Sequence, residues 1–143
     1  MNPSRARSLV EYFGRRTSDA DYLAVMQYRE AQRVAWLQLM AEKKLDAIVY
    51  ATYDAPTTVI PADVLTNPRP IDDYGRGDNR GFSPSLGWPA ITVPMGFTVE
   101  GLPAGLEMIG RPWSEAKLLG FAYAYEQGTR HRKAPGTVPG VGR

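Results

Sequence analysis

The stretch from residue 87 to residue 115, GWPAITVPMGFTVEGLPAGLEMIGRPWSE, limits what this chain can fold into more than any other part. It holds two short apolar runs, Ala90–Val93 and Leu106–Ile109, each bounded by glycine and proline. Apolar runs of this length with such flanks are typical of β-strands. The polar segment between them, residues 98–103, contains a glycine and a proline that favour a turn. The sequence therefore predicts an antiparallel hairpin.

Prolines and a helix complete this region. We expect the prolines at strand ends, where a missing N–H costs no ladder bond: Pro89, Pro94, Pro103 and Pro112. Ser114 is expected to cap a helix that runs to about His131. Helical spacing puts these residues on its core face: Leu118, Leu119, Ala122 and Tyr125.

Two helices and one strand are predicted before the hairpin. Residues 1–16 favour a short helix, and a longer one from Asp19 to about Lys44 has Thr17 or Ser18 as its N-cap. Its apolar stripe comprises Tyr22, Leu23, Met26, Val34, Leu37, Met40 and Ala41. Glu30 and Arg33, three apart within this stripe, could pair with each other or meet a partner outside the chain. The following run, LDAIVY at residues 45–50, predicts a buried strand of an α/β protein.

Composition excludes several classes of protein. The 143 residues include no cysteine, which excludes disulfides, thiolate metal sites and a cysteine nucleophile. The formal net charge of +2 is too small to indicate nucleic-acid binding. No apolar run approaches the roughly 18 residues of a membrane span, and the N-terminus lacks a signal-peptide core. We therefore expect a cytoplasmic protein that binds neither nucleic acid nor membrane. We expect one domain over residues 1–135, with irregular structure at residues 55–81 and a flexible tail at residues 136–143.

The hairpin resembles the C-terminal part of the amidase signature family, hydrolases that cut carboxylic amides. The family string "G-x-P-A-[IL]-[ST]-V-P-x-G-[FY] … G-[LM]-P-x-G-[LM]-[EQ]-x-[IL]-G-[RP]" is matched in order. The matching residues include Gly87, Pro89, Ala90, Val93, Pro94, Gly96, Gly101, Pro103, Gly105 and Gly110. Residues 45–52 are similar to the family's "[FL]-D-x-[IL]-[IVL]-x-P-[TS]" strand, with Ala51 in place of its proline. Residues 115–126 match its closing "E-x-x-L-[LI]-x-x-A-x-x-[YF]-E". Glu126-Gln127, leading to His131-Arg132 and Pro135, resembles the branch with peptide-amidase-like and aryl-acylamidase-like members.

The resemblance implies a fold and a set of substrate contacts. It implies the C-terminal part of an α/β/α layered fold, in which a mixed sheet is flanked by helices. In the family, the strand at residues 45–52 ends at the floor of the substrate pocket. By resemblance, the candidate substrate-binding residues are Tyr53, Asp54 and Trp88. The family's mechanism needs no cofactor and no metal, so we expect neither.

No catalytic residue is assigned within this sequence. The family uses a Ser–cis-Ser–Lys triad whose middle serine lies on a Gly/Ser-rich loop, and no such loop occurs here. The lysines, Lys43, Lys44, Lys117 and Lys133, are outside the family's lysine context. Ser83 and Ser85 match the segment that leads into the hairpin, and His131 is expected to be a charge-compatible helix cap.

Three hypotheses follow. The first is a C-terminal segment of an amidase-signature hydrolase, inactive alone, that acts on a small-molecule amide only when completed by the missing N-terminal portion. The second is a non-catalytic module that binds a ligand, complements a partner chain or forms a homo-oligomer. A severed sheet should leave an unprotected apolar edge, and the uncharged run Ala90–Val93 favours the first. An unrelated small α/β protein ranks last, because it requires the glycine and proline matches to be accidental.

Overall fold

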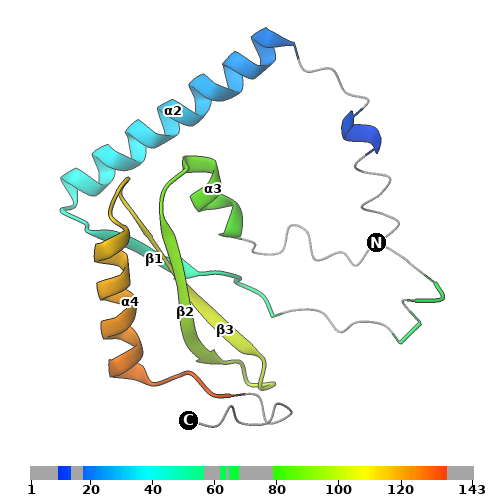
Figure 1. Ribbon diagram of the computed structural model, residues 1–143, viewed down its shortest axis with the longest axis vertical. Coiled ribbons are helices and arrows are strands. Elements are labelled where there is room, and N and C mark those ends of the chain that lie inside the picture. The colour runs from blue at the N-terminus through cyan, green and yellow to red at the C-terminus, as the bar shows by residue number, and fades with distance from the viewer. Residues whose placement is uncertain (1–9, 14–17, 57–61, 64, 68–78, 135–143) are drawn as a thin grey trace.

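The computed structural model describes residues 10–13, 18–56, 62–63, 65–67 and 79–134. The elements, shown in Figure 1, are α2 (Asp19–Glu42), β1 (Ala47–Ala51), the 3₁₀ turn η1 (Asn79–Gly81), α3 (Phe82–Leu86), β2 (Ala90–Phe97), β3 (Pro103–Gly110) and α4 (Glu115–Thr129). Residues 10–13 are helical, as predicted. The rest of the predicted helix over residues 1–16, most of the irregular segment at 55–81 and the tail at 136–143 lie outside the described residues.

The three strands pair antiparallel in the order β1-β3-β2. The predicted hairpin is confirmed, and both of its strands are longer than the apolar runs indicated. In its turn, the Thr98 N–H donates to the Leu102 carbonyl at 2.8 Å, and Gly101 adopts a φ of 80° that favours glycine. β3 is the central strand, so its backbone bonds to a neighbour on each side.

The prediction that the prolines lie at strand ends is wrong for Pro94. It lies inside β2, at a register break between Pro94 and Gly96, and not at the end of the strand. The Gly110 N–H donates to the Pro89 carbonyl. Because backbone hydrogen bonds between antiparallel strands recur at every second residue, Ile91 and Val93 also bond to β3. The backbone N–H positions of the alternate residues point away from β3. Pro94 is one of these alternate residues. Its missing N–H therefore costs no ladder bond, as expected, although its position differs.

Helices cover both faces of the sheet. On one face, Ile109 packs with Met40 of α2, with Leu86 of α3 and with Trp88. On the other face, Met108 and Val93 pack against Leu118 and Ala122 of α4. Figure 1 shows the sheet between α4 on one side and α2 with α3 on the other. The predicted α/β/α layering is therefore confirmed. The described strands pair only antiparallel, so the mixed sheet of the family fold stays a prediction.

The long helix α2 begins where the sequence predicts. Ser18 and Asp21 form a capping box, in which the Asp21 N–H donates to Ser18 Oγ at 3.1 Å. The predicted apolar stripe is wrong for most of its members, because only Leu37 and Met40 reach the core and the others are exposed: Tyr22, Leu23, Met26, Val34 and Ala41. The N-terminal half of α2 extends beyond the sheet and α3 (Figure 1), so only the C-terminal half, around Met40, reaches the core.

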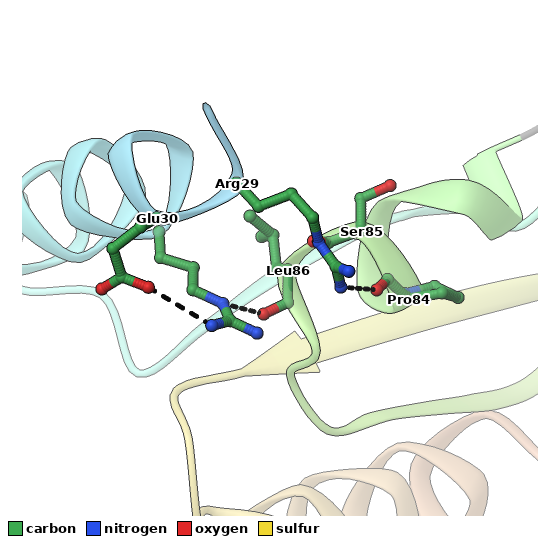
Figure 2. A network of polar contacts seen from close by, with 6 residues as sticks. Arg29, Glu30, Pro84, Ser85 and Leu86 are labelled. Carbon is green, nitrogen blue, oxygen red and sulfur yellow. Dashed lines mark hydrogen bonds and ion pairs between the residues drawn. The ribbon is translucent and has the colours of Figure 1, made fainter. Parts of the chain in front are cut away.

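Two arginines of α2 hold α3 in place (Figure 2). Arg29 donates from Nε to the Ser85 carbonyl at 2.8 Å and from Nη2 to the Pro84 carbonyl at 3.0 Å. Arg33 donates from Nε to the Leu86 carbonyl. The last carbonyls of a helix have no partner within it and carry partial negative charge, so guanidinium groups suit them.

The predicted pair of Glu30 and Arg33 is also present. Arg33 Nη1 lies 3.3 Å from Glu30 Oε2, and both side chains remain partly exposed. An ion pair with this exposure contributes little by itself. Its effect is to orient the guanidinium that binds the Leu86 carbonyl.

The last helix, α4, departs from prediction in three details. Ser114 occupies the N-cap position, but its hydroxyl donates to the Arg111 carbonyl at 2.7 Å and does not bond to the helix. Leu119 was expected on the core face and is exposed, since Leu118 and Ala122 occupy the buried stripe. α4 ends at Thr129 with Arg130 as its C-cap, so His131 lies one residue past the cap and its predicted role as the helix cap is wrong. Within the described ranges, no helix is both long and apolar enough to cross a membrane. The cytoplasmic location stays a prediction.

Gly87→Ala tests the junction between α3 and β2. Gly87 has a φ of 66°, and a Cβ there would lie 2.7 Å from Arg33 Nη2. We expect a loss of about 1–2 kcal/mol in the free energy of unfolding, from the left-handed backbone alone. Urea unfolding followed by tryptophan fluorescence measures this loss.

Gly120→Ala is the control, because Gly120 lies within α4 and a Cβ there meets nothing within 4 Å. This change should leave stability unchanged or raise it, since alanine favours helix. Equal stability of Gly87→Ala and the wild type would contradict the proposed constraint.

Candidate functional site

Two of the predicted substrate-binding residues follow β1 directly. Tyr53 is 39% exposed, and the Arg80 guanidinium lies 4.5 Å from the centre of its ring. This is a cation–π contact. Asp54 is exposed beside it. Both side chains are therefore accessible at the end of β1.

Trp88 lies elsewhere. It is only 4% exposed and belongs to the core cluster that contains Met40 and Ile109. Trp88 lies two residues before Ala90, which pairs with Ile109 near the C-terminal end of β3. Tyr53 lies two residues after Ala51, which pairs with Leu106 near the middle of β3. The structure thus places Tyr53 with Asp54 and leaves Trp88 toward the other end of β3. The substrate contacts of all three stay a prediction.

A buried carboxylate lies at the centre of the sheet. Glu107 on β3 is 6% exposed, and its Oε1 accepts a hydrogen bond from the Tyr50 hydroxyl at 2.8 Å. Tyr50 on β1 and Thr92 on β2 are its neighbours in register, and we call Tyr50, Glu107 and Thr92 the polar row. The row shares its face with Ile109, two residues along β3. A buried carboxylate is costly unless hydrogen-bonded, so the Tyr50 contact stabilises it.

The same contact affects Tyr50. Burial raises the pKa of the Tyr50 hydroxyl above its ordinary value, and the hydrogen bond to Glu107 raises it further. The hydroxyl therefore keeps its proton throughout the physiological range. Tyr50 is a hydrogen-bond donor that holds Glu107 in a fixed orientation.

A second polar group lies next to the polar row. The Thr52 N–H donates to the Gly105 carbonyl at 3.0 Å. A Cβ on Gly105 would lie 2.8 Å from Thr92 Cγ2 and 3.0 Å from Thr52 Oγ1, which is too close. The absence of a side chain at Gly105 therefore leaves room for both threonine side chains above β3. Thr52 Oγ1 is buried and has no hydrogen-bond partner among the described residues. A buried hydroxyl without a partner costs about 1–3 kcal/mol. A polar group of a ligand or of another polypeptide would remove this cost.

Asn79 fixes the chain where the family has proline. Its Nδ2 donates to the Ala51 carbonyl at 2.8 Å, and its N–H donates to the Thr52 carbonyl at 3.2 Å. Two hydrogen bonds thus hold the end of β1, where Ala51 replaces proline. Sequence reasoning identified Thr52 as a family match but missed Tyr50 and Glu107. The signal for Glu107 was a charged residue inside the apolar run LEMI.

Ser83 and Ser85 are both engaged with backbone. Ser83 Oγ donates to the Trp88 carbonyl at 2.7 Å, and Ser85 Oγ donates to the Gly81 carbonyl. A serine nucleophile needs an adjacent base to take its proton. Neither hydroxyl has a hydrogen bond to a lysine or histidine within the described part of the chain.

Two pockets adjoin these elements. One, of about 370 Å³, lies along the hairpin and is lined by Pro94, Phe97 and residues 131–133. In it, the His131 ring lies 6.4 Å from that of Tyr125, centre to centre. The other, of about 540 Å³, lies beside Trp88 and is lined also by Arg33, Leu37 and the exposed Trp113. Across the described residues, no group of three or more His, Asp or Glu side chains is placed to hold a metal ion.

The pKa shift of Tyr50 predicts how stability changes at alkaline pH. In the unfolded chain the hydroxyl loses its proton above about pH 10. The folded state, with its raised pKa, keeps the proton longer. Stability from this group is therefore fully present below pH 10 and falls as the pH rises further.

Thermal melts of wild type and Tyr50→Phe between pH 8 and pH 11 measure this effect. We expect the difference in melting temperature to shrink above pH 10, because Phe has no proton to lose. Parallel curves would show that Tyr50 titrates alike in both states. Tyr53→Phe, at an exposed position, is the control and should follow the wild type.

Comparison with known proteins extends the match along the chain. The family model described as Amidase matches residues 6–119. A fatty acid amide hydrolase of Arabidopsis thaliana is 40% identical over 114 residues, which are 77% of this chain and 18% of that protein. One subunit of the glutamyl-tRNA(Gln) amidotransferase of a Psychrobacter species is 39% identical over 111 residues, 73% of this chain and 21% of that protein.

Solved structures agree. The native peptide amidase of Stenotrophomonas maltophilia superposes with a TM-score of 0.61 at 34% identity, covering 82% of this chain and 22% of the peptide amidase. An amidase family protein of Bacillus anthracis superposes with a TM-score of 0.61 at 25% identity, over 84% of this chain and 19% of that protein. This chain spans about a fifth of the length of these relatives. With four-fifths of its own length matched by the family model, the chain belongs to the Amidase family.

Proposed function

We propose that this chain acts as the C-terminal segment of an amidase-signature hydrolase, which converts a carboxylic amide and water to an acid and an amine or ammonia. The family match over residues 6–119 is the observation that carries this proposal. The relatives are about five times longer, which leaves room for the catalytic parts outside this sequence.

In this proposal the segment binds and orients the substrate. The buried Thr52 hydroxyl and the Glu107 carboxylate lie on one face at the end of β1. They offer a hydrogen-bonding surface to the amide, either directly or through a neighbouring side chain. Tyr50 fixes Glu107, and Tyr53 and Asp54 stand at the exposed border. Fixed hydrogen-bonding groups accelerate a reaction by holding the substrate close to its reactive geometry.

The Ser–cis-Ser–Lys triad is proposed to come from the remainder of the amidase domain. The hydroxyls of Ser83 and Ser85 donate to backbone carbonyls, which supports their structural use. Lys117 pairs with Asp46 at 2.6 Å, and Lys133 lies over the Phe97 ring. Neither contact suits a proton acceptor. The partner is thus a complementing polypeptide that carries the triad, and the substrate is a small-molecule amide. No cofactor or metal is required by this chemistry.

The test is amide hydrolysis with and without the rest of an amidase domain. The purified chain should not hydrolyse a generic anilide or a simple primary amide. Co-expression with the part of the S. maltophilia peptide amidase that this chain does not match should restore turnover. In that complex, Thr52→Val should lower kcat/KM about tenfold, which corresponds to one buried hydrogen bond. Thr129→Val, at the end of α4, is the matched control and should leave turnover unchanged.

Other outcomes point elsewhere. Turnover by the chain alone that disappears in Ser83→Ala or Ser85→Ala would contradict the proposed division of labour. No turnover in either preparation, together with a cooperative circular-dichroism melt of the chain alone, would favour a non-catalytic binding module.

A further inference from the structure

Trp113 is unusual among the exposed side chains of this protein. It is 92% exposed, and its backbone has a φ of 65°, in the left-handed region that bulky residues rarely adopt. Burial does not explain an indole at this position, because the ring is open to solvent. A residue held in such a conformation costs free energy, and such residues gather at binding sites. Trp113 is therefore a candidate for ligand contact.

The turn that carries Trp113 is fixed by hydrogen bonds. The N–H and the Oγ of Ser114 both donate to the Arg111 carbonyl, at 3.2 Å and 2.7 Å. Arg111 Nη2 in turn donates to the carbonyls of Met40 and Leu45, at 3.2 Å and 3.1 Å. The turn is thus attached to the end of α2. A group that the fold already holds in place loses less conformational freedom when a ligand binds.

Trp113 lines the pocket of about 540 Å³ together with Trp88. This volume lies within the range of small-molecule sites. Trp88 is buried and Trp113 is exposed, so one indole belongs to the core and the other stands at the border of the pocket. Pro89 and Pro112 also line it, and the Gly110 N–H holds their two segments together through its bond to the Pro89 carbonyl. The pocket therefore combines aromatic rings with rigid apolar surface.

The charged groups of this pocket leave one carboxylate unpaired. Arg33 and Glu30 lie 3.3 Å apart, so their charges compensate each other. The third charged group, Glu115, makes no ion pair within the described ranges. Its place in the first turn of α4 accounts for a negative charge there, but not for the pocket that it borders. The pocket thus carries a net negative charge beside aromatic rings.

We propose that this pocket binds a small organic cation, an alkylammonium group that contacts the Trp113 ring and pairs with Glu115. The face of an aromatic ring attracts a cation, and tryptophan does so more strongly than tyrosine or phenylalanine. A carboxylate next to the ring adds Coulombic attraction. An anion would be repelled by both groups, and a neutral ligand would leave Glu115 unpaired.

The pocket is separate from the proposed substrate-binding surface. It lies past the C-terminal end of β3, beside Pro112, whereas Thr52 bonds to Gly105 in the N-terminal half of β3. Residues 105 and 110 of this strand are about 17 Å apart. Trp88, a predicted substrate contact, lines this pocket and not the surface near Tyr53. The inference is therefore independent of the proposed function.

Titration with choline tests the site, because choline carries a trimethylammonium group. In the isotope-labelled 143-residue chain, NMR resolves the indole N–H signals of three tryptophans. Choline should shift those of Trp113 and Trp88 in a saturable way. The signal of Trp36, whose ring packs against Phe82 at 4.9 Å, should stay unchanged. The neutral alcohol 3,3-dimethyl-1-butanol, which has the same shape without the charge, should bind at least tenfold more weakly.

Trp113→Gly separates binding from stability. It removes the ring and suits the left-handed backbone, so it should weaken choline binding about tenfold while the melting temperature stays unchanged or rises. A ring needed only for stability would lower the melting temperature when removed. Tyr123→Ala, at a position of α4 that is 67% exposed, is the control and should bind choline as the wild type does. If Trp113→Gly fails to fold, the comparison of choline with the neutral alcohol decides.

Glu115→Gln tests the carboxylate. It keeps the size of the side chain and removes the charge, so it should weaken choline binding about threefold, as expected for an exposed ion pair. Glu100→Gln, in the turn of the hairpin and outside the pocket, is the matched control and should bind choline with unchanged affinity.

Several results would overturn the proposal. Equal binding of choline and 3,3-dimethyl-1-butanol would show that the pocket does not select a cation. Unchanged choline affinity in both Trp113→Gly and Glu115→Gln, or a shift at Trp36 alone, would place the cation elsewhere. A doubled mass with a Trp113 signal that choline does not shift would mean that a second copy of the chain covers the pocket.

The same titration in the co-expressed complex with the unmatched part of the S. maltophilia peptide amidase should shift Trp113 and Trp88 again. Loss of these shifts in the complex would mean that the pocket is an internal contact and would contradict the proposal. Amide turnover is not measured in these experiments, so their failure would leave the proposed function untouched.

Discussion

The burial of both faces of β3 is the constraint on which the rest of this structure depends. Adjacent residues, Met108 and Ile109, point to opposite faces, and each anchors a separate core cluster. A strand that is apolar on both faces needs a neighbour at each edge and a helical layer on each side. β1 and β2 are the neighbours at the two edges of β3. α2 and α3 form the layer on one face, and α4 forms the layer on the other. Only Glu107 interrupts this apolar strand, and Tyr50 supplies its hydrogen bond.

Arginine side chains then fix the helices through their C-terminal carbonyls. Arg29 (Figure 2) and Arg33 bind the last carbonyls of α3. Arg111, just past β3, binds the carbonyl of Met40 in the last turn of α2 and that of Leu45, which follows the end of α2. These contacts join residues more than fifty positions apart. Guanidinium groups satisfy carbonyls that a helix leaves unpaired, so a short helix such as α3 can end abruptly at Gly87.

The two halves of β3 have different chemistry beside them. Along the N-terminal half, Thr52 has a buried hydroxyl with no hydrogen-bond partner among the described residues. Unsatisfied polar groups are costly when buried, so this hydroxyl indicates where a polar group from outside the chain would stabilise the structure. Past the C-terminal end, Trp113 is exposed and its backbone is held in a costly conformation. Both costs fall at positions where contacts with other molecules would offset them.

The sequence alone determined the local features. The hairpin, the strand after residue 45, the capping box at Ser18 and the glycine and proline pattern of the amidase family all depend on neighbouring residues, where turn and capping chemistry act. Tertiary structure decided the rest. The place of β3 at the centre, the bulge at Pro94, the exposed half of α2 and the turn of Leu119 to solvent depend on which segments meet across long separations. The same holds for the polar row, because Tyr50 and Glu107 become neighbours only through the strand register. Periodicity shows that a residue can be buried, but only the packing partner determines whether it is.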